Sequence, residues 1–210
     1  SDCRTLMFEL TNRTALITGA GSGIGFAIAQ RFTQAGASVI IADIKDATKQ
    51  AAELGGTFLY VDVGNEQSVR ELMMQVVSKD MSLDILVNNA GIMLESDQIV
   101  NESEDAFKRH FEVNTLGTIR CIKYAVPIMQ CGSSIVNIGS IAAVLGMSSI
   151  AAYSISKSSV IGVTKVAAVE LESKGIRVNC VCPGSTNTLL GRTEEDDIFT
   201  SKASLIGRLA

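Results

Sequence analysis

The sequence predicts one α/β domain with a doubly wound parallel sheet, and two observations lead to this fold class. Six short runs rich in β-branched residues alternate with segments whose apolar residues recur at spacings of three and four. Alternating strands and helices of this kind build a parallel sheet that is covered by helices on both faces. No internal repeat and no Pro-rich or Ser-rich linker divides the 210 residues, so residues 1–210 are expected to form a single domain.

The expected elements follow one another in a regular order. The first strand is predicted at residues 14–18 and leads through a glycine-rich turn into a helix over residues 24–35. Gly36 and Gly175 follow two helical patterns, at positions where a left-handed residue commonly ends a helix. Because ligands of such sheets bind beyond the carboxyl ends of the strands, functional residues are sought there. Later strands are predicted at residues 38–42, 57–61, 84–87, 134–138 and 176–181, and further crossover helices at residues 46–54, 66–79 and 153–174.

The composition is that of an ordinary soluble domain. Apolar residues make up 47% and charged residues 19% of the chain, and a chain of this length buries a core without disulfides or metal ions. The net charge of -4 provides no basic surface for a phosphate backbone, so nucleic acid is not an expected partner. The longest uncharged stretches are too interrupted to cross a membrane, and the N-terminus does not read as a secretory signal. A cytoplasmic location without a membrane partner is therefore expected.

The cysteines and the histidine exclude further kinds of site. The five cysteines form an odd set without metal-ligand spacing, and Cys180 and Cys182 lie in an apolar, strand-like run. The cysteines are expected to be buried, reduced thiols. His110 is the only histidine, which removes most zinc sites and every catalytic triad that depends on histidine. No metal site is predicted.

A glycine-rich turn after the first predicted strand is the first candidate binding site. Its glycines permit a tight turn, let a pyrophosphate approach the backbone and allow the helix to pack closely on the strand, while the helix N-terminus supplies amide donors. A glycine-rich turn without a ligand, or a site for another nucleotide or a methyl donor, is the alternative. The predicted cofactor contacts in this turn are Gly19, Ser22, Gly23, Ile24 and Gly25.

An acidic residue, Asp43, closes the second predicted strand 18 residues after Gly25. This is close to the spacing expected for the acid that binds an adenosine ribose, where a carboxylate accepts from both hydroxyls and repels a 2′-phosphate. Ser22 in the turn offers no guanidinium for that phosphate, so NAD is predicted and NADP is disfavoured. Lys45 weakens this preference, and capping of the helix near Asp46 is the alternative role for Asp43.

Two more strand ends carry polar or small residues. Asp62 and Val63, at the third strand, are predicted to lie against the adenine, although such a pair also ends ordinary strands. After the fourth strand, two adjacent amides can bond backbone groups of neighbouring strand ends, and small residues leave space for a flat ring. A plain turn would have the same composition. The predicted cofactor contacts in this segment are Asn89, Ala90 and Gly91.

The sharpest chemical pattern is Tyr153 with Lys157 at the start of a long predicted helix. Residues four apart share one helix face, so an ammonium is expected near a phenol. A phenol with a pKa of ~10 is a poor base at neutral pH, but a nearby cation lowers that pKa. Such a pair is common by chance, and it becomes specific together with the glycine turn and the upstream Ser140.

In this order and at these intervals, the motifs resemble the short-chain dehydrogenase/reductase family over roughly residues 8–210. The resemblance implies a Rossmann-type three-layer α/β/α fold and an NAD(P)-dependent oxidoreductase that needs no metal. The matching motifs are the glycine turn, Asn88 to Gly91, Asn114, Gly139-Ser140, Tyr153 with Lys157, and Pro183-Gly184.

The resemblance also implies roles for individual residues. Tyr153 would be the general acid/base, and Lys157 would bind the nicotinamide ribose and hold the pKa of the phenol down. Ser140 would bind the substrate oxygen together with Tyr153, and Asn114, within a helix, would support a water that carries protons to solvent. The residues implied to lie around the nicotinamide are Pro183, Gly184, Thr186 and Thr188.

The substrate is expected to be a modest apolar secondary alcohol or its ketone. Residues 141–150 beside Ser140 are mainly small and apolar, and residues 187–205 are the variable part of the resemblance. Four acids at residues 194–197 would repel substrates carried on coenzyme A or on an acidic protein, unless they form a solvated loop. Two alternatives stay open: an NADP-dependent 3-oxoacyl reductase and a non-catalytic nucleotide-binding scaffold.

The end of the chain departs from the family pattern. Family members continue through another helix and a seventh strand, and nothing after Val181 resembles that strand. The sixth strand is therefore expected to have an open edge. A homodimer or homotetramer is expected from the family, although the missing strand would remove part of its contacts. A truncated chain would explain the same observation.

Overall fold

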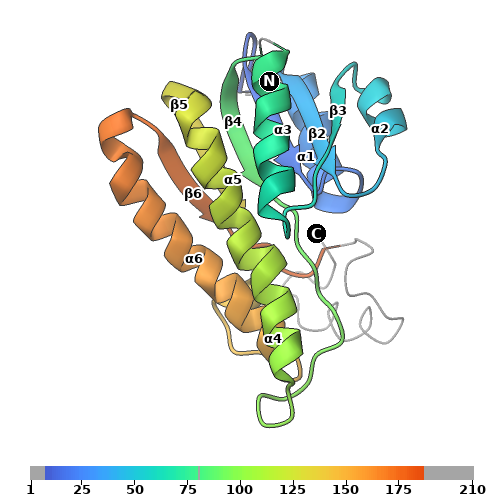
Figure 1. Cartoon of the computed structure of the whole chain (residues 1–210), viewed down its shortest axis with the longest axis vertical. Helices are drawn as coiled ribbons and strands as arrows, with labels where there is room; N and C mark the ends of the chain where they lie inside the picture. Colours follow the sequence, from blue (N-terminus) through green and yellow to red (C-terminus); the bar gives the residue numbers. More distant parts are fainter. Residues whose placement is uncertain (1–7, 80, 187–210) are drawn as a thin grey trace, which may run out of the picture.

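A six-stranded parallel sheet forms the centre of the molecule (Figure 1). This computed structural model describes residues 8–79 and 81–186. Its strands are β1 (Thr14–Thr18), β2 (Ser38–Asp43), β3 (Thr57–Tyr60), β4 (Leu83–Asn88), β5 (Met129–Ile138) and β6 (Arg177–Val181). They lie in the order β3-β2-β1-β4-β5-β6, and every neighbouring pair is parallel. The doubly wound sheet predicted from the sequence is therefore confirmed.

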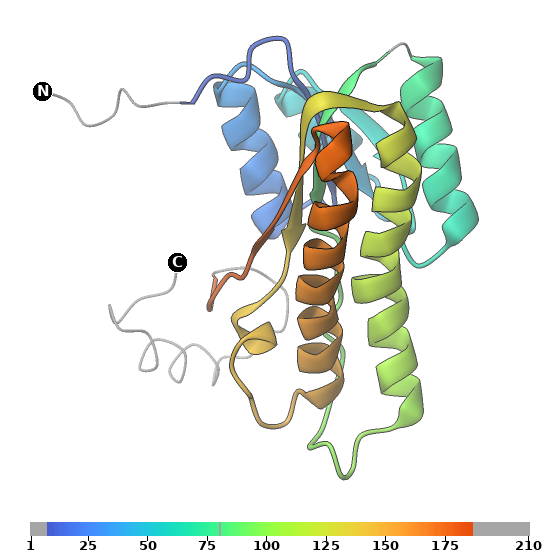
Figure 2. The same ribbon diagram turned by 90° about the vertical axis from the view of Figure 1, so that its left-hand side faces the viewer.

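Helices cover both faces of this sheet. They are α1 (Gly23–Gln34), α2 (Thr48–Glu53), α3 (Glu66–Ser78), α4 (Glu104–His110), α5 (Gly117–Ala125) and α6 (Ala151–Leu171). Figure 2 shows α1 on one side of the sheet and α3, α5 and α6 on the other. Shorter helical segments are a π-helical segment at Phe111–Leu116 and 3-10 turns at Val126–Ile128, Ile141–Ala143 and Glu172–Lys174. Within residues 8–79 and 81–186, none of the helices combines the length and the apolar character that a membrane span requires.

Two hydrophobic cores lie on opposite faces of the sheet, and β1 contributes to both. Ala15 and Ile17 belong to the core that α1 and α2 cover, whereas Leu16 belongs to the core that α3, α5 and α6 cover. All three side chains are fully buried, because successive residues of a strand point to opposite faces. Coverage of both faces explains why the strands are continuous apolar runs, which is the pattern that predicted them.

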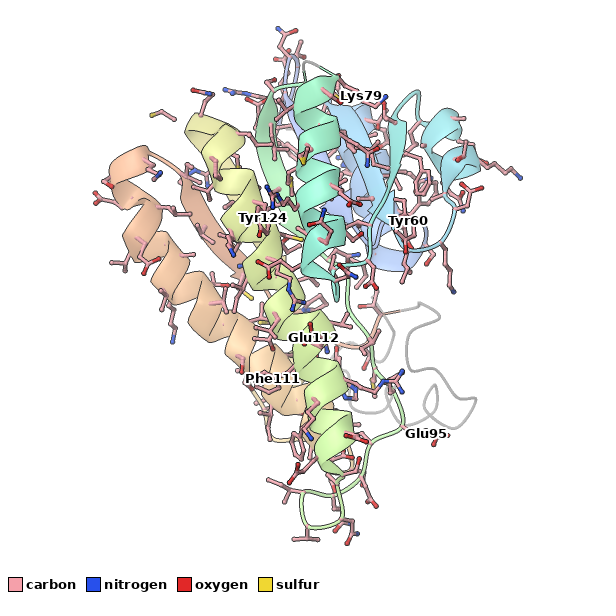
Figure 3. The ribbon with its side chains drawn as sticks, in the orientation of Figure 1. Tyr60, Lys79, Glu95, Phe111, Glu112 and Tyr124 are labelled. Atoms are coloured by element: carbon pink, nitrogen blue, oxygen red, sulfur yellow. The ribbon has the colours of Figure 1, made fainter. Side chains whose placement is uncertain are left out.

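The helices α4 and α5 join through the π-helical segment into one rod from Glu104 to Ala125 (Figure 1). Figure 3 labels Phe111, Glu112 and Tyr124 along this rod. From the sequence, only a helix around Asn114 was expected in this part of the chain. The start of α4 is marked by polar residues instead of apolar ones. Ser103 caps the helix, and acidic residues occupy its first turn, so these were the signals that could have predicted it.

The pairing of β1 with β4 joins the two halves of the sheet. Its register runs over three residue pairs, from Ala15 opposite Ile85 to Ile17 opposite Val87. Asp84 closes one end of this pairing, because its carboxylate accepts from the Thr14 N–H at 2.9 Å and from Arg13 Nη1 at 2.8 Å. The strand order reverses between β1 and β4, and doubly wound sheets bind ligands beyond such a point.

Candidate active site

The glycine turn after β1 packs directly against the end of β4. Gly19 has a φ of +63°, and a Cβ at this position would lie 2.8 Å from Ala90 Cα. A Cβ at Gly25 would lie 2.5 Å from Asn89 Nδ2. Both positions therefore require glycine, one for its backbone conformation and both for the close approach of the two segments.

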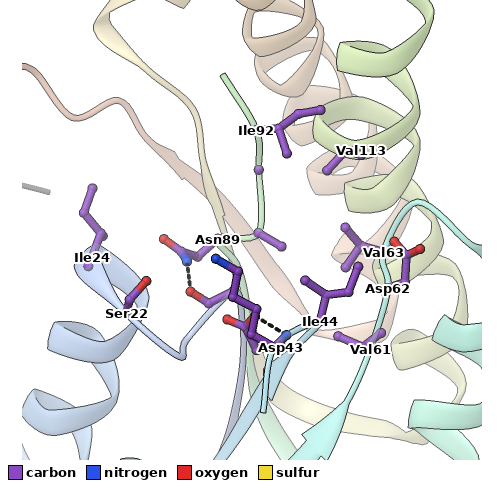
Figure 4. A pocket seen from close by; sticks show the side chains of 15 residues that line it. Ser22, Ile24, Asp43, Ile44, Val61, Asp62, Val63, Asn89, Ile92 and Val113 are labelled. Carbon is purple, nitrogen blue, oxygen red and sulfur yellow. Dashed lines mark hydrogen bonds between the residues drawn. The ribbon is translucent and has the colours of Figure 1, made fainter. Parts of the chain in front are cut away.

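Hydrogen bonds hold the glycine turn against the segment that follows β4. Asn89 Nδ2 donates to the Gly19 carbonyl at 2.9 Å (Figure 4). It also donates to the Thr18 carbonyl at 2.9 Å. Thr18 Oγ1 in turn accepts from the N–H groups of Asn89 and Ala90, at 3.1 Å each. Asn88 bonds the other neighbouring strand through Asn137 Oδ1 at 2.8 Å. The predicted bonds to backbone groups of a neighbouring strand end are therefore confirmed for Asn89, whereas Asn88 bonds a side chain of β5.

Asp43, at the end of β2, faces the glycine turn. Its Oδ2 accepts from the Gly21 N–H at 2.9 Å, and its Oδ1 accepts from the Lys45 N–H at 3.0 Å. These two bonds fix the direction of the carboxylate and still leave lone pairs on both oxygens. At the next strand end, Asp62 Oδ1 accepts from the Gly64 N–H at 2.9 Å.

A cavity of about 460 Å³ opens between these strand ends (Figure 4). Ten of the predicted cofactor contacts line it, which are Gly19, Ser22, Gly23, Ile24, Asp43, Asp62, Val63, Asn89, Ala90 and Gly91. Sequence reasoning gave no cofactor contact to the other lining residues, Ile44, Lys45, Val61, Ile92 and Val113. Most of these five residues are sequence neighbours of a predicted cofactor contact. That adjacency is the signal from which they could have been predicted.

Tyr153 and Lys157 lie in the first two turns of α6, and both side chains are buried, with 8% and 4% of their surface exposed. Lys157 Nζ donates to the Ile138 carbonyl at the end of β5, at 2.8 Å. A Cβ at Gly91 would lie 3.2 Å from Nζ, so the ammonium also reaches the cavity-lining segment after β4. Burial lowers the pKa of Lys157 to about 8.

The acidity of Tyr153 differs from the expectation. Burial raises the pKa of its phenol above the ordinary value, and the nearby Ser140 hydroxyl opposes this change only in part. The expected lowering by Lys157 is wrong for the protein alone, because desolvation outweighs the effects that favour phenolate. Ser140 is itself held by the Ala142 N–H, which donates to its Oγ at 3.1 Å.

Asn114 lies in the π-helical segment and clamps the chain after Gly91. Its Nδ2 donates to the Ile92 carbonyl at 2.9 Å, and its Oδ1 accepts from the Ile92 N–H at 2.8 Å. The same Nδ2 donates to Ser156 Oγ at 3.0 Å, which connects this segment to α6 beside Tyr153. Single π turns are frequent at functional sites. The proton-carrying water at Asn114 stays a prediction.

His110 is a site residue that sequence reasoning missed. Its ring is fully buried, Nε2 accepts from the Leu94 N–H at 3.1 Å, and Nδ1 lies 2.7 Å from the Ala106 carbonyl. The ring packs edge-on against Tyr153, with the centroids 6.3 Å apart. Its place four residues before Asn114, about one helical turn, was the available signal.

The segment after β6 lies beside Ser140 rather than along the cavity lining. The Ile141 N–H donates to the Pro183 carbonyl at 2.8 Å, and Thr186 Oγ1 donates to the Gly184 carbonyl at 3.0 Å. Thr188 and the acids at residues 194–197 lie outside the described residues. The nicotinamide contacts of Pro183, Gly184, Thr186 and Thr188 remain predictions.

Known proteins resemble this chain over most of its length. A family model described as enoyl-(acyl carrier protein) reductase matches residues 19–206. The 3beta-hydroxysteroid dehydrogenase of Mediterraneibacter gnavus is 35% identical over 208 residues, which are 95% of this chain and 75% of that protein. The mitochondrial borneol dehydrogenase of Lavandula x intermedia is 39% identical over 198 residues, which are 92% of this chain and 76% of that protein.

A solved structure shows the same fold. The 3-ketoacyl-(acyl-carrier-protein) reductase from Brucella melitensis, complexed with NADH, superposes with a TM-score of 0.89 at 31% identity. The superposition covers 96% of this chain and 86% of that chain.

Proposed function

This chain belongs to the short-chain dehydrogenase/reductase family, and we propose that it is an NAD-dependent oxidoreductase that interconverts a secondary alcohol and its ketone. The single observation that carries this proposal is the position of Tyr153. Its buried phenol lies near Ser140, whose hydroxyl counteracts part of the rise in its pKa, and one helical turn before Lys157. Lys157 contacts the segment that lines the cavity, so a proton-transfer group and a cofactor-sized cavity adjoin.

The residues around the cavity fit a dinucleotide. The volume of about 460 Å³ lies within the range of small-molecule sites. The Asp43 carboxylate has lone pairs directed by its two backbone bonds, which suits two ribose hydroxyls and opposes a 2′-phosphate. When bound, NAD would supply the hydride acceptor, or NADH the hydride donor. Lys157 would bind the nicotinamide ribose, and Pro183 and Gly184 would adjoin the carboxamide.

The chain's own residues handle the proton. Because burial raises the pKa of Tyr153, its phenol keeps its proton at neutral pH and can donate it to a carbonyl oxygen during reduction. Ser140 would bind the same substrate oxygen and stabilise charge that develops on it. In the direction of oxidation, Tyr153 would accept the alcohol proton, and Asn114 would support the water that exchanges protons with solvent.

The substrate is proposed to be apolar. Val144, Leu145 and Met147 follow Ser140 along the chain and are exposed, so they offer an apolar surface next to the catalytic groups. The names of the two compared dehydrogenases refer to a steroid and a terpene alcohol. These observations support alicyclic secondary alcohols and their ketones as the first substrates to test.

The test is the substitution Tyr153→Phe, which removes the proton-carrying oxygen and keeps the ring. Purified protein is assayed with NADH against a panel of steroid, terpene and small cyclic ketones, by the absorbance of reduced nicotinamide. We expect kcat to fall about 10²–10⁴-fold, because a positioned general acid contributes a factor of this size. NADH affinity, measured by fluorescence titration, should stay near that of the unchanged protein.

Tyr124→Phe is the matched control. The Tyr124 hydroxyl donates to Glu66 Oε1 at 2.8 Å, near the end of α5 and ten residues after Asn114 along the rod, so its loss should leave kcat intact. A Tyr153→Phe variant that turns over at the original rate would reject Tyr153 as the acid/base. Cofactor binding without turnover on the whole panel would instead favour a nucleotide-binding scaffold.

The second candidate function is an NADP-dependent 3-oxoacyl reductase. The names of the matching family model and of the Brucella melitensis structure refer to reductases of carrier-protein substrates. Lys45 lines the cavity beside Asp43, where its ammonium could pair with a 2′-phosphate. Asp43 opposes that phosphate, so the two candidates differ in their relative affinity for NADH and NADPH.

The proposed enzyme works in the cytoplasm on a small-molecule substrate, as a homodimer or homotetramer. Exposed apolar side chains on α5 and α6, including Ile119, Val166 and Val169, support self-association through these helices.

A further inference from the structure

Two cysteines meet at the end of β6, close to the proposed catalytic residues. Cys180 is the penultimate residue of β6, and Cys182 follows the strand directly. Residues two apart in an extended chain point to the same side. The two sulfur atoms accordingly lie 3.9 Å apart, and both side chains are partly exposed to solvent. The expectation of buried cysteines is wrong for this pair and for Cys131, which is exposed.

The pair is packed against the backbone that carries Ser140. A Cβ at Gly139 would lie 2.9 Å from Cys182 Sγ and 3.0 Å from Cys180 Sγ, so glycine gives both sulfurs their space. In their ionised form, both cysteines would raise the pKa of Lys157, so they lie within electrostatic range of its ammonium. Any chemical change at this pair therefore acts within reach of Ser140 and Lys157.

We propose that Cys180 and Cys182 form a redox modification site, at which a hydroperoxide converts the two thiols into an intramolecular disulfide. One thiolate attacks a peroxide oxygen, the O–O bond breaks, and a sulfenic acid forms with release of one water, or of one alcohol from an organic peroxide. The second thiol attacks the sulfenic sulfur, the S–S bond forms, and a second water leaves. Two thiols are oxidised by two electrons, and the peroxide is reduced by two electrons.

The disulfide would strain the strand end. A disulfide needs its sulfurs about 2.05 Å apart and its Cα atoms within about 6.8 Å, whereas two extended residues span about 6.6 Å. The bridge thus sits near the limit of unstrained geometry, and strained disulfides are readily reduced again. Burial and the neighbouring Cys182 raise the pKa of the Cys180 thiol, so a smaller fraction of it is thiolate at neutral pH and its oxidation is slow.

The strain would reach Ser140 through two backbone bonds. The Gly139 N–H donates to the Val181 carbonyl and the Ile141 N–H donates to the Pro183 carbonyl, both at 2.8 Å. The donors of these two bonds are the residues before and after Ser140, and the acceptors are the residues before and after Cys182. Contraction between Cys180 and Cys182 therefore displaces Ser140, and turnover falls. This effect on turnover rests on the proposed function, whereas formation of the disulfide does not.

The first experiment maps the thiols of the full chain after exposure to hydrogen peroxide. Remaining thiols are blocked with an alkylating reagent, and the protein is digested with trypsin, which cuts after Arg177 and Arg192 and leaves both cysteines in one peptide. We expect this peptide to lose two hydrogens and to carry no alkyl group. Dithiothreitol should restore two alkylatable thiols. Two alkylated thiols in the peroxide-treated peptide, at a dose that oxidises Cys131, would overturn the proposal.

The second experiment compares activity before and after peroxide in each variant. The unchanged protein should lose activity about tenfold or more, since small misplacements at an active site have effects of this size, and recover it with dithiothreitol. Cys182→Ser should escape this reversible loss, whereas Cys131→Ser should retain it. Cys121 is fully buried with a pKa raised to about 12, so it should not react.

The two experiments separate the possible failures. An equal, reversible loss in Cys182→Ser would assign the loss to another site and overturn the regulatory effect. A protein that forms the mapped disulfide but turns over no substrate would keep the modification site and reject the proposed function.

Discussion

At the scale of single residues, burial governs the acid–base chemistry of the site. Both Tyr153 and Lys157 are removed from water, which disfavours the charged form of each. Their spacing of four residues identified the pair but did not predict this outcome. Spacing along a helix says which side chains share a face, whereas the depth of that face depends on the sheet and the rod packed against it.

The pKa of Lys157 predicts a pH dependence of stability. The ordinary lysine pKa of 10.5 applies to the unfolded chain and a pKa of about 8 to the folded one, so between these values the unfolded chain binds more protons. The free energy of unfolding therefore rises with pH in this window. Relative to Lys157→Met, the unchanged protein should gain about 2 kcal/mol from about pH 7 to about pH 9.5.

Urea unfolding at several pH values measures the difference in the free energy of unfolding between the unchanged protein and Lys157→Met. The comparison removes contributions from Tyr153 and Cys180, which both proteins keep. If this difference in the free energy of unfolding stays constant with pH, the pKa of Lys157 lies near its ordinary value.

Residues that bind backbone at strand ends were predictable, and residues that act through packing were not. Asn89 and Asp43 stand at fixed places relative to the glycine turn, and their bonding capacity follows from their side chains. His110 instead contacts Tyr153 across two elements, the rod and α6. The spacing of His110 from Asn114 indicates a shared helix face but not Tyr153 as the neighbour, because that contact exists only after the elements pack.

At the scale of elements, α6 obtains its N-terminal carboxylate from another segment. Its N-cap, Ile150, has no polar side chain, and its first turn contains no acid. The carboxylate of Glu102 lies near this helix end, since the Ala152 N–H contributes to lowering its pKa, and it accepts from the backbone N–H groups of Asp97 and Ser103 and from Ser96 Oγ. These bonds lower the pKa of Glu102. Tyr153, the proposed acid/base, therefore lies next to a helix end that a loop distant in the sequence holds in place.

Removal of this carboxylate should loosen both the loop and the start of α6. We expect Glu102→Ala to lower the free energy of unfolding by about 1–2 kcal/mol, since several backbone donors lose a charged acceptor. Turnover should fall more than NADH affinity, because the change lies beside Tyr153 rather than along the cavity.

Chemical unfolding and steady-state kinetics check this prediction. Glu104→Ala is the control, because Glu104 is exposed and pairs only with Lys108 among the described residues, so its effect should stay within about 0.5 kcal/mol. Equal stabilities of the two variants would contradict the capping role.

The sequence predicted most elements because apolar periodicity defines buried faces, and it failed where polar residues define the element. The strands and α1, α3 and α6 carry clear apolar patterns. The rod from Glu104 to Ala125 does not, since charged residues fill its first turns and a π turn interrupts its period. The early start of β5 at Met129, five residues before the prediction, was missed for a related reason. Cys131, Gly132 and Ser133 separate it from the apolar part of the strand.

At the scale of the whole molecule, the cavity lies where the strand order reverses, so a ligand bound there would contact both halves of the sheet. Binding to the folded protein alone adds stability through mass action. At about a hundred times its dissociation constant, NADH should add about 2.7 kcal/mol, which corresponds to a rise in Tm of about 5–10 °C for a chain of this size.

The same measurement decides between the two cofactors. NADPH at an equal concentration should raise Tm less, because Asp43 repels the 2′-phosphate. Asp43→Asn keeps the size of the side chain and should reduce the difference between the Tm shifts with NADH and NADPH. Asp46→Asn, at a neighbouring exposed acid, should leave that difference unchanged. A larger shift with NADPH in the unchanged protein would favour the 3-oxoacyl reductase.

The short pairing of β1 with β4 is fastened at both ends, by Asp84 below and by Asn89 with Thr18 above. The β1–β4 pairing is therefore not a weak point of the sheet, although it is short. Amide hydrogens of β1 and β4 should exchange with solvent together, in one cooperative opening event, and the two half-sheets should not come apart as separate folding units.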